Sequence, residues 1–350
     1  MAARMKDIAE ALGLSIVTVS KVLNKNDAKI SEPTRQRVLA CARKLDYRTN
    51  LAAKELATGQ SRMVGLIVPD LLHGFFAEIA AHMSESLAQQ HYSLIISSSR
   101  DDEKLEEREI RQMLARRVDA LVVASCSTDA RILASANREV PVILLDRQVG
   151  AAGAFPLIGT DDHMAGELAT QHFIDLGRRR IAFIGAATLS PSHDREQAYR
   201  KALSRARIKV SPRFVVRLPQ NEESYHVLGE RVMRQMLKLK PRPDAVFCYN
   251  DPSAWGAMQA ILDEGLRIPE DIAIAGCGNV FYNTLMRVPL TSVNQNAALL
   301  GVEAAKLALR VLRERLSKTR HRSTKLLLKP TLAVRASTVS CADPAVTRRT

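Results

Sequence analysis

From Met63 onward, the sequence alternates between short apolar runs and longer amphipathic segments. The segments 75–90, 103–117 and 164–176 repeat apolar residues at helical spacing, and the runs between them are nearly continuous in Val, Ile, Leu and Ala. This alternation predicts parallel sheets that are covered by helices on both faces. The expected strands are 64–68, 94–97, 120–124, 142–145, 181–185, 245–249 and 272–276.

These strands are enough for two sheets of about four to six strands each. We expect the break between the sheets near residues 160–162. In parallel sheets, ligands bind outside the carboxyl ends of the strands. The loops at those ends carry charged, amide and aromatic side chains, as a polar small-molecule site needs. They are 69–74, 97–102, 146–150, 186–194, 250–253 and 277–281.

The first 45 residues have a different pattern, which predicts three short helices. The first ends at Gly13, the second spans about residues 16–23 after Ser15, and Ser31 is the expected N-cap of the third. Two helices joined by a short turn, with a third across them, are typical of a helix-turn-helix, and a generic three-helix bundle is the alternative. The expected core is Ile8, Ala9, Leu12, Val19, Val22, Leu23, Val38, Leu39, Ala42 and Leu45.

The net charge of +14 is concentrated at the two ends of the chain. Residues 1–60 carry 11 Lys or Arg against 6 Asp or Glu, and residues 313–350 carry 10 against 2. The 252 residues between them are nearly neutral, with 30 basic and 29 acidic side chains. Basic ends on a neutral body indicate an acidic polymer as partner, and charge alone does not separate DNA from RNA.

Several classes of protein find no support in the sequence. The N-terminus lacks the apolar region of a secretory signal, so we expect a cytoplasmic protein without a membrane segment. The five cysteines form no Cys-x-x-Cys pair and the eight histidines show no ligand spacing, so no metal site is expected. Nucleotide-binding loops, a nucleophile elbow and zinc-protease motifs are missing as well. We therefore expect neither catalytic residues nor a cofactor.

Two segments near the N-terminus resemble the lactose/galactose repressor family of transcriptional regulators. Residues 6–24 (KDIAEALGLSIVTVSKVLN) are similar to its DNA-binding signature, and residues 45–56 (LDYRTNLAAKEL) resemble its hinge helix. The resemblance extends over about residues 4–338. It includes Val64–Asp70, Asp146-Arg147, Arg195-x-x-x-Tyr199, Asn250-Asp251 and Leu290–Val293.

The resemblance implies a helix-turn-helix domain (1–48), a hinge helix and linker (49–61), and a two-lobed core like that of periplasmic binding proteins (62–340). A basic tail (341–350) would follow. The core would contain two parallel sheets, with lobe 1 at 62–160 and 294–324 and lobe 2 at 161–293 and 325–340. The chain would cross between the lobes three times, near Thr160, Val293 and Lys325. A homodimer is also implied, with its hinge helices in the minor groove of a palindromic operator.

On the DNA-binding side, the resemblance implies that Ile16, Val17 and Lys21 select the operator sequence. Ile16 and Val17 would pack on thymine methyl groups, and Lys21 would reach a guanine or a phosphate. Leu56 would wedge between base steps. The alternatives are that Ile16 and Val17 belong to the core and that Leu56 packs between helices. The remaining DNA-contact candidates are Thr18, Ser20, Asn24, Asn50 and Ala53.

On the ligand side, the resemblance implies that Phe75, Asp146, Arg195, Asn250 and Gln295 contact a small-molecule effector. Phe75 would stack on a ring face, and Arg195 would offer its guanidinium fork to hydroxyls or a carboxylate. Asn250 can both donate and accept. Core packing of Phe75 and a surface salt bridge of Arg195 are the alternatives.

One departure from the family pattern concerns the effector. Sugar-binding members commonly carry Asp where Gly278 stands, so an acceptor for sugar hydroxyls is missing here. We hypothesise a sugar acid or phosphosugar that Arg195 contacts. The alternative is that Asp102, Asp146 or Asn279 replaces the missing acceptor. Tyr225 is a candidate for an aromatic wall from the second lobe.

The sequence thus predicts an effector-controlled transcriptional regulator, most simply a repressor of genes for carbohydrate or a related carbon source. A corepressor-dependent regulator or an activator of the same fold is the first alternative. A non-regulatory sugar-binding protein is the second, although that class requires export.

Overall fold

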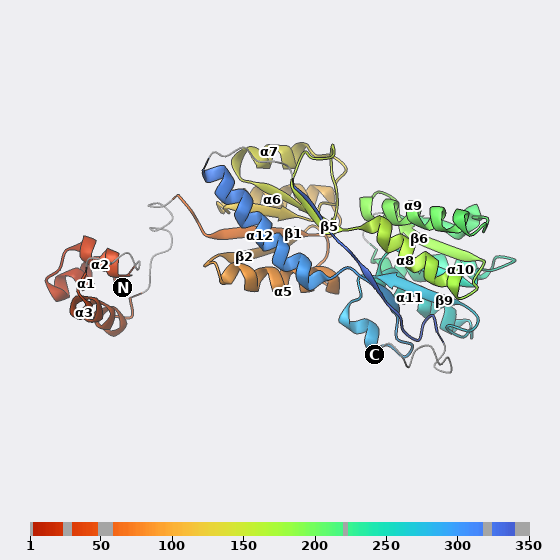
Figure 1. Ribbon diagram of the computed structural model, residues 1–350. Coiled ribbons are helices and arrows are strands. Elements are labelled where there is room, and N and C mark those ends of the chain that lie inside the picture. Colours follow the sequence, from red (N-terminus) through yellow and green to blue (C-terminus); the bar gives the residue numbers. More distant parts are fainter. Residues whose placement is uncertain (1–2, 24–29, 48–58, 220–222, 318–323, 340–350) are drawn as a thin grey trace. The chain divides into compact units, whose positions relative to one another are not determined.

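The computed structural model describes residues 3–23, 30–47, 59–219, 223–317 and 324–339. The chain divides into two compact units, residues 1–61 and 62–350 (Figure 1). The hinge helix and basic tail expected from the sequence lie outside the described residues, apart from the end of the linker.

In its described residues, the first unit has three helices around a small apolar core. Gly13 ends the first helix in the left-handed conformation at φ 62°, where a side chain would be strained. The hydroxyl of Ser15 accepts a hydrogen bond from the backbone N–H of Thr18 at 3.1 Å, which caps the second helix. The helices are α1 (Met5–Leu12), α2 (Ile16–Leu23) and α3 (Glu32–Lys44).

The expected core of this unit is correct except at two leucines. Ile8, Val19 and Val38 are fully buried, whereas Leu39 and Leu45 are 41% and 38% exposed. On α3 the buried residues Val38 and Ala42 lie four positions apart on one face, and Leu39 is rotated about 100° from Val38. Leu45 follows the last turn of the helix.

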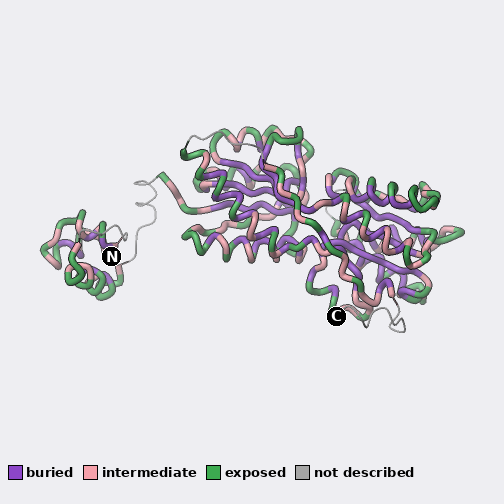
Figure 2. The backbone as a smooth tube through the Cα atoms, in the orientation of Figure 1, coloured by how far each residue is buried: buried purple, intermediate pink, exposed green. Residues whose placement is uncertain are grey.

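The second unit has two lobes, and the first lobe is built on a six-stranded parallel sheet of order β11-β5-β4-β3-β1-β2. Helices α5 (Gly74–Ala88) and α12 (Ala297–Leu316) pack on one face, and α6 (Glu103–Ala115) and α7 (Arg131–Glu139) pack on the other. The strands are almost entirely buried at the centre of the sheet (Figure 2). They are β1 (Met63–Val68), β2 (Ser93–Ser98), β3 (Ala120–Val123), β4 (Val142–Leu145), β5 (Leu157–Thr160) and β11 (Lys325–Leu328).

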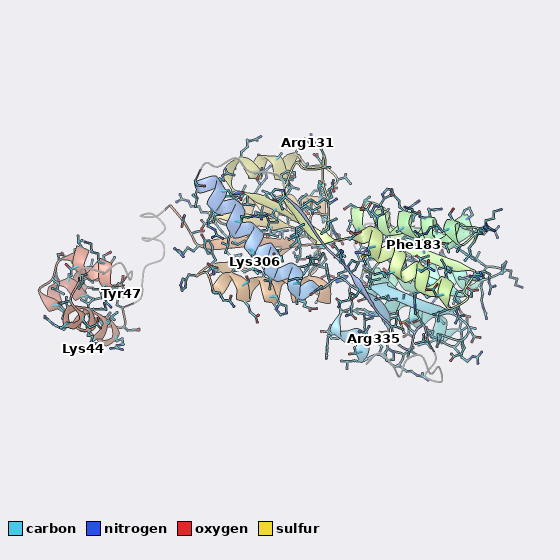
Figure 3. All side chains as sticks on the ribbon, viewed as in Figure 1. Lys44, Tyr47, Arg131, Phe183, Lys306 and Arg335 are labelled. Atoms are coloured by element: carbon cyan, nitrogen blue, oxygen red, sulfur yellow. The ribbon has the colours of Figure 1, made fainter. Side chains whose placement is uncertain are left out.

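The second lobe repeats this plan with the strand order β12-β10-β9-β8-β6-β7, in which only β12 is antiparallel to its neighbour. Phe183 of β6 lies in its core, stacked on Tyr199 at 5.4 Å between ring centroids (Figure 3). The helices are α8 (Asp162–Asp175), α9 (Ser190–Arg205), α10 (Tyr225–Leu237) and α11 (Asp251–Asp263). The strands are β6 (Ile181–Ala186), β7 (Val215–Leu218), β8 (Ala245–Cys248), β9 (Ala273–Cys277), β10 (Thr291–Asn294) and β12 (Thr331–Ala333).

The chain crosses between the lobes at three short connections. Asp161 joins β5 to α8, residues 295–296 join β10 to α12, and Lys329-Pro330 joins β11 to β12. The expected third crossing near Lys325 is wrong, because β11 pairs with β5 and extends the first sheet. Residues 325–328 therefore belong to the first lobe, and the crossing lies four residues later.

Candidate functional site

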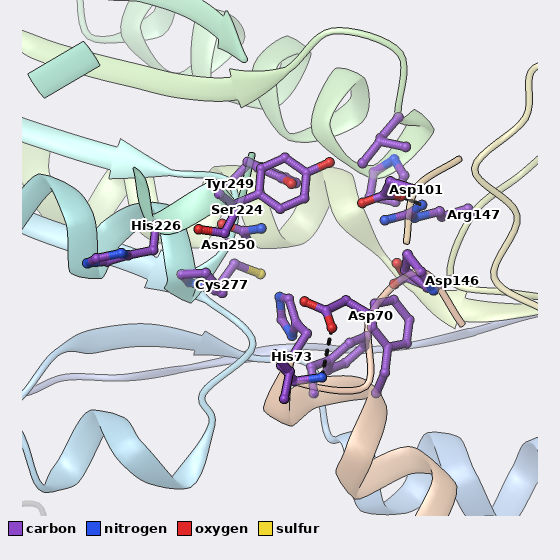
Figure 4. Close-up of a pocket in the computed structure, with 18 of the residues that line it drawn as sticks. Asp70, His73, Asp101, Asp146, Arg147, Ser224, His226, Tyr249, Asn250 and Cys277 are labelled. Atoms are coloured by element: carbon purple, nitrogen blue, oxygen red, sulfur yellow. Dashed lines mark hydrogen bonds and ion pairs between the residues drawn. The ribbon is translucent and has the colours of Figure 1, made fainter. Parts of the chain in front are cut away.

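A cavity of about 440 Å³ lies between the lobes of the second unit (Figure 4). The chain segments around it follow the carboxyl ends of strands in both sheets, where parallel sheets place ligand sites. All five predicted effector contacts line it, namely Phe75, Asp146, Arg195, Asn250 and Gln295.

Arg195 of α9 is buried against a carboxylate of its own lobe. Its Nε and Nη2 donate to Oδ1 of Asp162 at 2.9 and 2.6 Å, and its Nη1 donates to the carbonyl oxygen of Tyr249. Only 3% of Arg195 is exposed, so the surface salt bridge considered above is replaced by a buried one. Burial raises the pKa of Asp162, and the attraction of the Arg195 guanidinium opposes that rise. The guanidinium therefore faces the cavity with its charge already compensated.

The first lobe contributes a second buried arginine, which sequence analysis did not identify as a site residue. Nη1 of Arg147 lies 2.7 Å from Oδ1 of Asp101, and both side chains are almost fully buried. The guanidinium carbon lies 5.9 Å from the centroid of the Phe76 ring, within cation–π range. Each lobe thus presents one arginine that is paired with a carboxylate of the same lobe.

Asp146 and Gln295 link the cavity to the crossings between the lobes. Nε2 of Gln295 lies 3.4 Å from Oδ1 of Asp146 and donates to the hydroxyl of Thr160 at 3.1 Å. Burial raises the pKa of Asp146, against the attraction of Arg195 and of the adjoining Arg147. One amide thus connects two of the three crossings to a buried acid of the cavity.

Asn250 has a structural task in addition to its place in the cavity wall. It is the N-cap of α11, and its Oδ1 accepts from the backbone N–H of Ser253 at 2.9 Å and from the Ser253 hydroxyl at 2.6 Å. Because its oxygen is engaged in this way, Asn250 would meet a ligand mainly as a donor through Nδ2.

Aromatic side chains from both lobes complete the wall. Phe75 packs edge-on against Phe76, with 5.1 Å between the ring centroids, and it is also part of the apolar core beneath it. It therefore both lines the cavity and packs in the core. Tyr225, the candidate from the second lobe, lines the cavity and meets Tyr249 edge-on at 5.4 Å. His73 also lines the cavity, and burial lowers its pKa to about 4, so its ring is neutral at neutral pH.

Gly278 occupies a position where a side chain would be strained. Its φ is 131°, and a Cβ there would lie 3.0 Å from Oδ2 of Asp251. Oδ2 of Asp251 already accepts from the backbone N–H of Val280 and from Nδ2 of Asn283. Cys277 lines the cavity beside this turn, and burial raises the pKa of its thiol. Of the suggested substitutes for the missing acceptor, only Asp146 lines the cavity.

In the first unit, α2 displays two apolar side chains on its surface. Ile16 is 48% and Val17 is 63% exposed, so neither belongs to the core. Lys21 is exposed on the same helix, and Thr18 and Ser20 are half-buried. The other predicted DNA contacts, Asn24, Asn50, Ala53 and Leu56, lie outside the described residues.

The described part of the chain has neither a membrane-spanning helix nor a cluster of metal-binding side chains. No helix there is long and apolar enough to cross a membrane. No group of three or more His, Cys, Asp or Glu side chains there is arranged to hold a metal ion.

Comparisons with known proteins agree with this architecture. Residues 4–50 match the bacterial regulatory proteins of the lacI family, and residues 61–331 match the periplasmic binding proteins and sugar binding domain of the LacI family. The chain belongs to the LacI family of bacterial transcriptional regulators. The resemblance identified from the sequence and the predicted fold class are therefore confirmed.

Relatives match over nearly the whole length. The ribose operon repressor of Escherichia coli is 31% identical over 345 residues, which cover 96% of this chain and 99% of that protein. The HTH-type transcriptional repressor PurR of Mannheimia succiniciproducens is 30% identical over 339 residues, which cover 96% of this chain and 98% of that protein. The lac repressor dimer bound to operator and an anti-inducer has a TM-score of 0.82 at 26% identity, with 97% and 100% covered.

The cavity of this LacI-family regulator is also lined by residues that the sequence did not single out as effector contacts. His73, Arg147, Tyr249 and Trp255 all line the cavity. Only Arg147 carried a signal, because it lies in the Asp146-Arg147 pair that contributed to the resemblance. Trp255 sits on α11, and its Nε1 donates to Asn283 at 2.8 Å, a contact that spans 28 residues of sequence.

Proposed function

We propose that this LacI-family regulator is a homodimeric repressor that binds a palindromic operator and responds to a small-molecule effector in the cavity between its lobes. The observation that carries the proposal is the composition of that cavity. It combines paired arginines, an amide that links two crossings, and aromatic walls. Such a site binds a polar molecule and senses how the lobes are placed. The protein would act in the cytoplasm and catalyse no reaction.

The exposed side chains of α2 support a sequence-reading role. The side chains of Ile16 and Val17 have no hydrogen-bonding groups, and their exposure leaves apolar surface in contact with water. Packed against thymine methyl groups, they would gain apolar contact and exclude other bases. Lys21 would add a guanine or phosphate contact, while Thr18, Ser20 and Asn24 would position the helix on phosphates. Asn50, Ala53 and Leu56 are assigned to the minor groove by the family resemblance.

A binding assay tests the DNA half of the proposal. Fluorescence anisotropy would compare a palindrome from upstream of this gene with a scrambled duplex at fixed salt, since phosphate contacts make affinity salt-dependent. We expect a preference of about 10³-fold or more. Ile16→Ala should lower the ratio of the affinity for the palindrome to that for the scrambled duplex. Lys201→Ala in the second unit should leave this ratio unchanged. Equal binding to both duplexes, with and without effector candidates, would contradict the proposal.

For the effector, the cavity supports a neutral polar molecule better than the acidic one hypothesised from the sequence. Arg195 and Arg147 are each paired with a buried carboxylate, so neither offers an uncompensated charge. The side chains that line the cavity include four acids and three arginines, which leaves no positive excess to attract an anion. Paired guanidiniums, the Asn250 amide and Asp146 suit hydroxyls or ring nitrogens.

A thermal-shift panel separates the two effector classes. Neutral pentoses, hexoses and nucleobases would be compared with the matching sugar acids and sugar phosphates. Stabilisation by a neutral compound alone is the expected result, and stabilisation by acids alone would restore the earlier hypothesis. The sign of the hit's effect on operator affinity then separates an inducible repressor from a corepressor-dependent one. An effector that binds without changing operator affinity would leave the sugar-binding alternative.

A further inference from the structure

A second cavity lies beside the amino ends of the parallel strands of the second sheet, which we call its amino edge. The effector cavity lies at the carboxyl ends of the strands, the carboxyl edge. The volume of the second cavity is about 430 Å³. Ile181 begins β6, Phe214 precedes β7, and Pro241 precedes β8, so the cavity opens at the amino ends of these parallel strands. Nothing in the proposed regulatory function uses this edge.

The floor of this second cavity is apolar and built into the fold. Ile181 and Leu203 are 2% and 1% exposed and belong to the core of the lobe. Phe214 presents an aromatic ring beside them, and the half-buried Ile208 and Leu239 complete the floor. Core side chains of the lobe therefore form the floor of this cavity.

The rim of the second cavity carries only positive charge. Five cationic side chains line it and no carboxylate does. Arg180 alone has an ion pair, 3.4 Å from Asp244, and within the described chain the other four form none. Cations gathered on one rim repel one another, and a bound anion would reduce that repulsion. The four are Arg179, Lys209, Arg213 and Lys240.

Charge and shape together restrict what would fit. Inorganic phosphate would satisfy the rim but leave the apolar floor in water, and a neutral apolar molecule would cover the floor but not the rim. The volume lies within the usual range of about 300–1,000 Å³ for small-molecule sites. We infer that this cavity binds an organic anion with an apolar ring or chain and a phosphate-like group, which we call the distal anion site.

Calorimetry on the full-length protein tests the site with 1-naphthyl phosphate as the probe. At about pH 8 its phosphate is a dianion, because its second ionisation lies near pH 6. We expect it to bind at least about tenfold more tightly than either 1-naphthol or inorganic phosphate, each of which supplies half of the recognition.

Two double variants with equal charge loss locate the binding. Arg213→Gln with Lys240→Gln removes two rim cations and should weaken binding at least about tenfold. Arg207→Gln with Lys238→Gln removes two exposed cations of the neighbouring segments that do not line the cavity, and should change the affinity less than about twofold. All four side chains are exposed, so both proteins should unfold at the same urea concentration as the wild type.

Three results would overturn the inference. Equal weakening in both double variants would indicate a diffuse basic surface without a site. Unchanged binding in both would place the probe elsewhere, for instance in the effector cavity. Binding of inorganic phosphate as tight as that of 1-naphthyl phosphate would remove any role for the apolar floor. None of these outcomes depends on whether the protein represses transcription.

Discussion

The two edges of the second sheet carry cavities of similar volume, about 440 and 430 Å³, but they treat positive charge in opposite ways. At the carboxyl edge, Arg195 is buried and paired with Asp162. At the amino edge, Arg213 and its neighbours are exposed, and the structure describes an ion pair for only one of the five cations. The pairing of the cations, more than their number, therefore indicates what each cavity binds.

Both edges are connected by one helix. Arg195 and Leu203 lie eight residues apart on α9, a rise of about 12 Å, and one faces the effector cavity while the other floors the distal anion site. Arg195 is held by a buried ion pair, whereas Leu203 contributes apolar packing. Substitutions at these two positions should therefore change stability by different amounts and for different reasons.

The largest expected difference concerns the removal of one arginine from each edge. Arg195→Met leaves Asp162 buried without its partner, which should lower the free energy of unfolding by about 3–5 kcal/mol. Arg213→Met at the exposed edge should change it by less than about 0.5 kcal/mol. Urea unfolding at neutral pH measures both. A loss below about 1 kcal/mol in Arg195→Met would mean that the buried pair contributes no more than a surface one.

A double variant sharpens this test. Replacing both Arg195 and Asp162 by leucine removes the uncompensated charge, so it should be less destabilising than Arg195→Met alone. If the double variant is the less stable of the two, the loss comes from packing and hydrogen bonds and not from the buried charge.

The second prediction concerns how stability depends on pH. Of the two cavities, only the effector cavity is lined by histidines. Because the pKa of His73 is lowered to about 4, the unfolded chain binds a proton below about pH 6.5 that the folded chain does not. Stability present above that pH is lost as the pH falls towards about 4, by at most about 1.4 kcal/mol per pH unit. Urea unfolding of the wild type and His73→Phe at several pH values measures the difference.

The variant His73→Phe should show a shallower loss of stability on acidification than the wild type. The matched change at the other edge, Lys209→Met, should leave the wild-type slope unchanged, because a lysine stays protonated over this range. Identical slopes in all three proteins would show that His73 is solvated and titrates normally.

The third prediction uses salt to separate the cavities. Raising NaCl from about 0.05 to about 0.5 M screens exposed charges far more than buried ones. Binding of 1-naphthyl phosphate at the distal anion site should therefore weaken about tenfold, and binding of a neutral effector should change less than about twofold. Calorimetric titrations at both salt concentrations measure this, and equal sensitivity would remove the electrostatic distinction between the edges.

The smallest effect is expected at Asn250, which serves both the fold and the effector cavity. Asn250→Ala removes the cap of α11 and should cost about 1 kcal/mol of stability. Asn250→Ser keeps a capping oxygen and should recover most of that loss, while both variants lose the Nδ2 donor and bind the effector more weakly. Thermal unfolding and effector titration distinguish the two roles. Full effector affinity in Asn250→Ser would limit Asn250 to capping.

Sequence patterns predicted the fold best where strands are continuously apolar. All seven expected strands are present, including β1 and β6, because a buried parallel strand is apolar along its whole length. Two of the strands that were not predicted contain glycine or polar residues. Residues 157–160 contain Gly and Thr, and residues 291–294 contain Thr, Ser and Asn. Their strand conformation comes from pairing with neighbours that are distant in sequence.

The site residues also divide into those that the sequence predicted and those that depend on contacts between distant segments. Arg195 was identified through the family resemblance, but its partner Asp162 lies 33 residues earlier, and no local pattern joins them. The hypothesis of an acidic ligand followed from Gly278, where sugar-binding members commonly carry Asp, with Arg195 as the expected contact, and it did not include the pairing of Arg195 with Asp162. His73 resembled any loop residue, since its lowered pKa comes from burial that only the assembled lobes provide. The sequence does not show which side chains pair when they are distant along the chain.

The three crossings between the lobes have a mechanical consequence. Only Asp161, residues 295–296 and Lys329-Pro330 separate the elements of one lobe from those of the other. Three connections of one or two residues, side by side, allow the lobes to pivot but resist their translation and twisting. Most of the relative motion therefore reduces to one rotational degree of freedom. A molecule in the effector cavity therefore acts on that rotation to the extent that it binds the two lobe placements with different affinity.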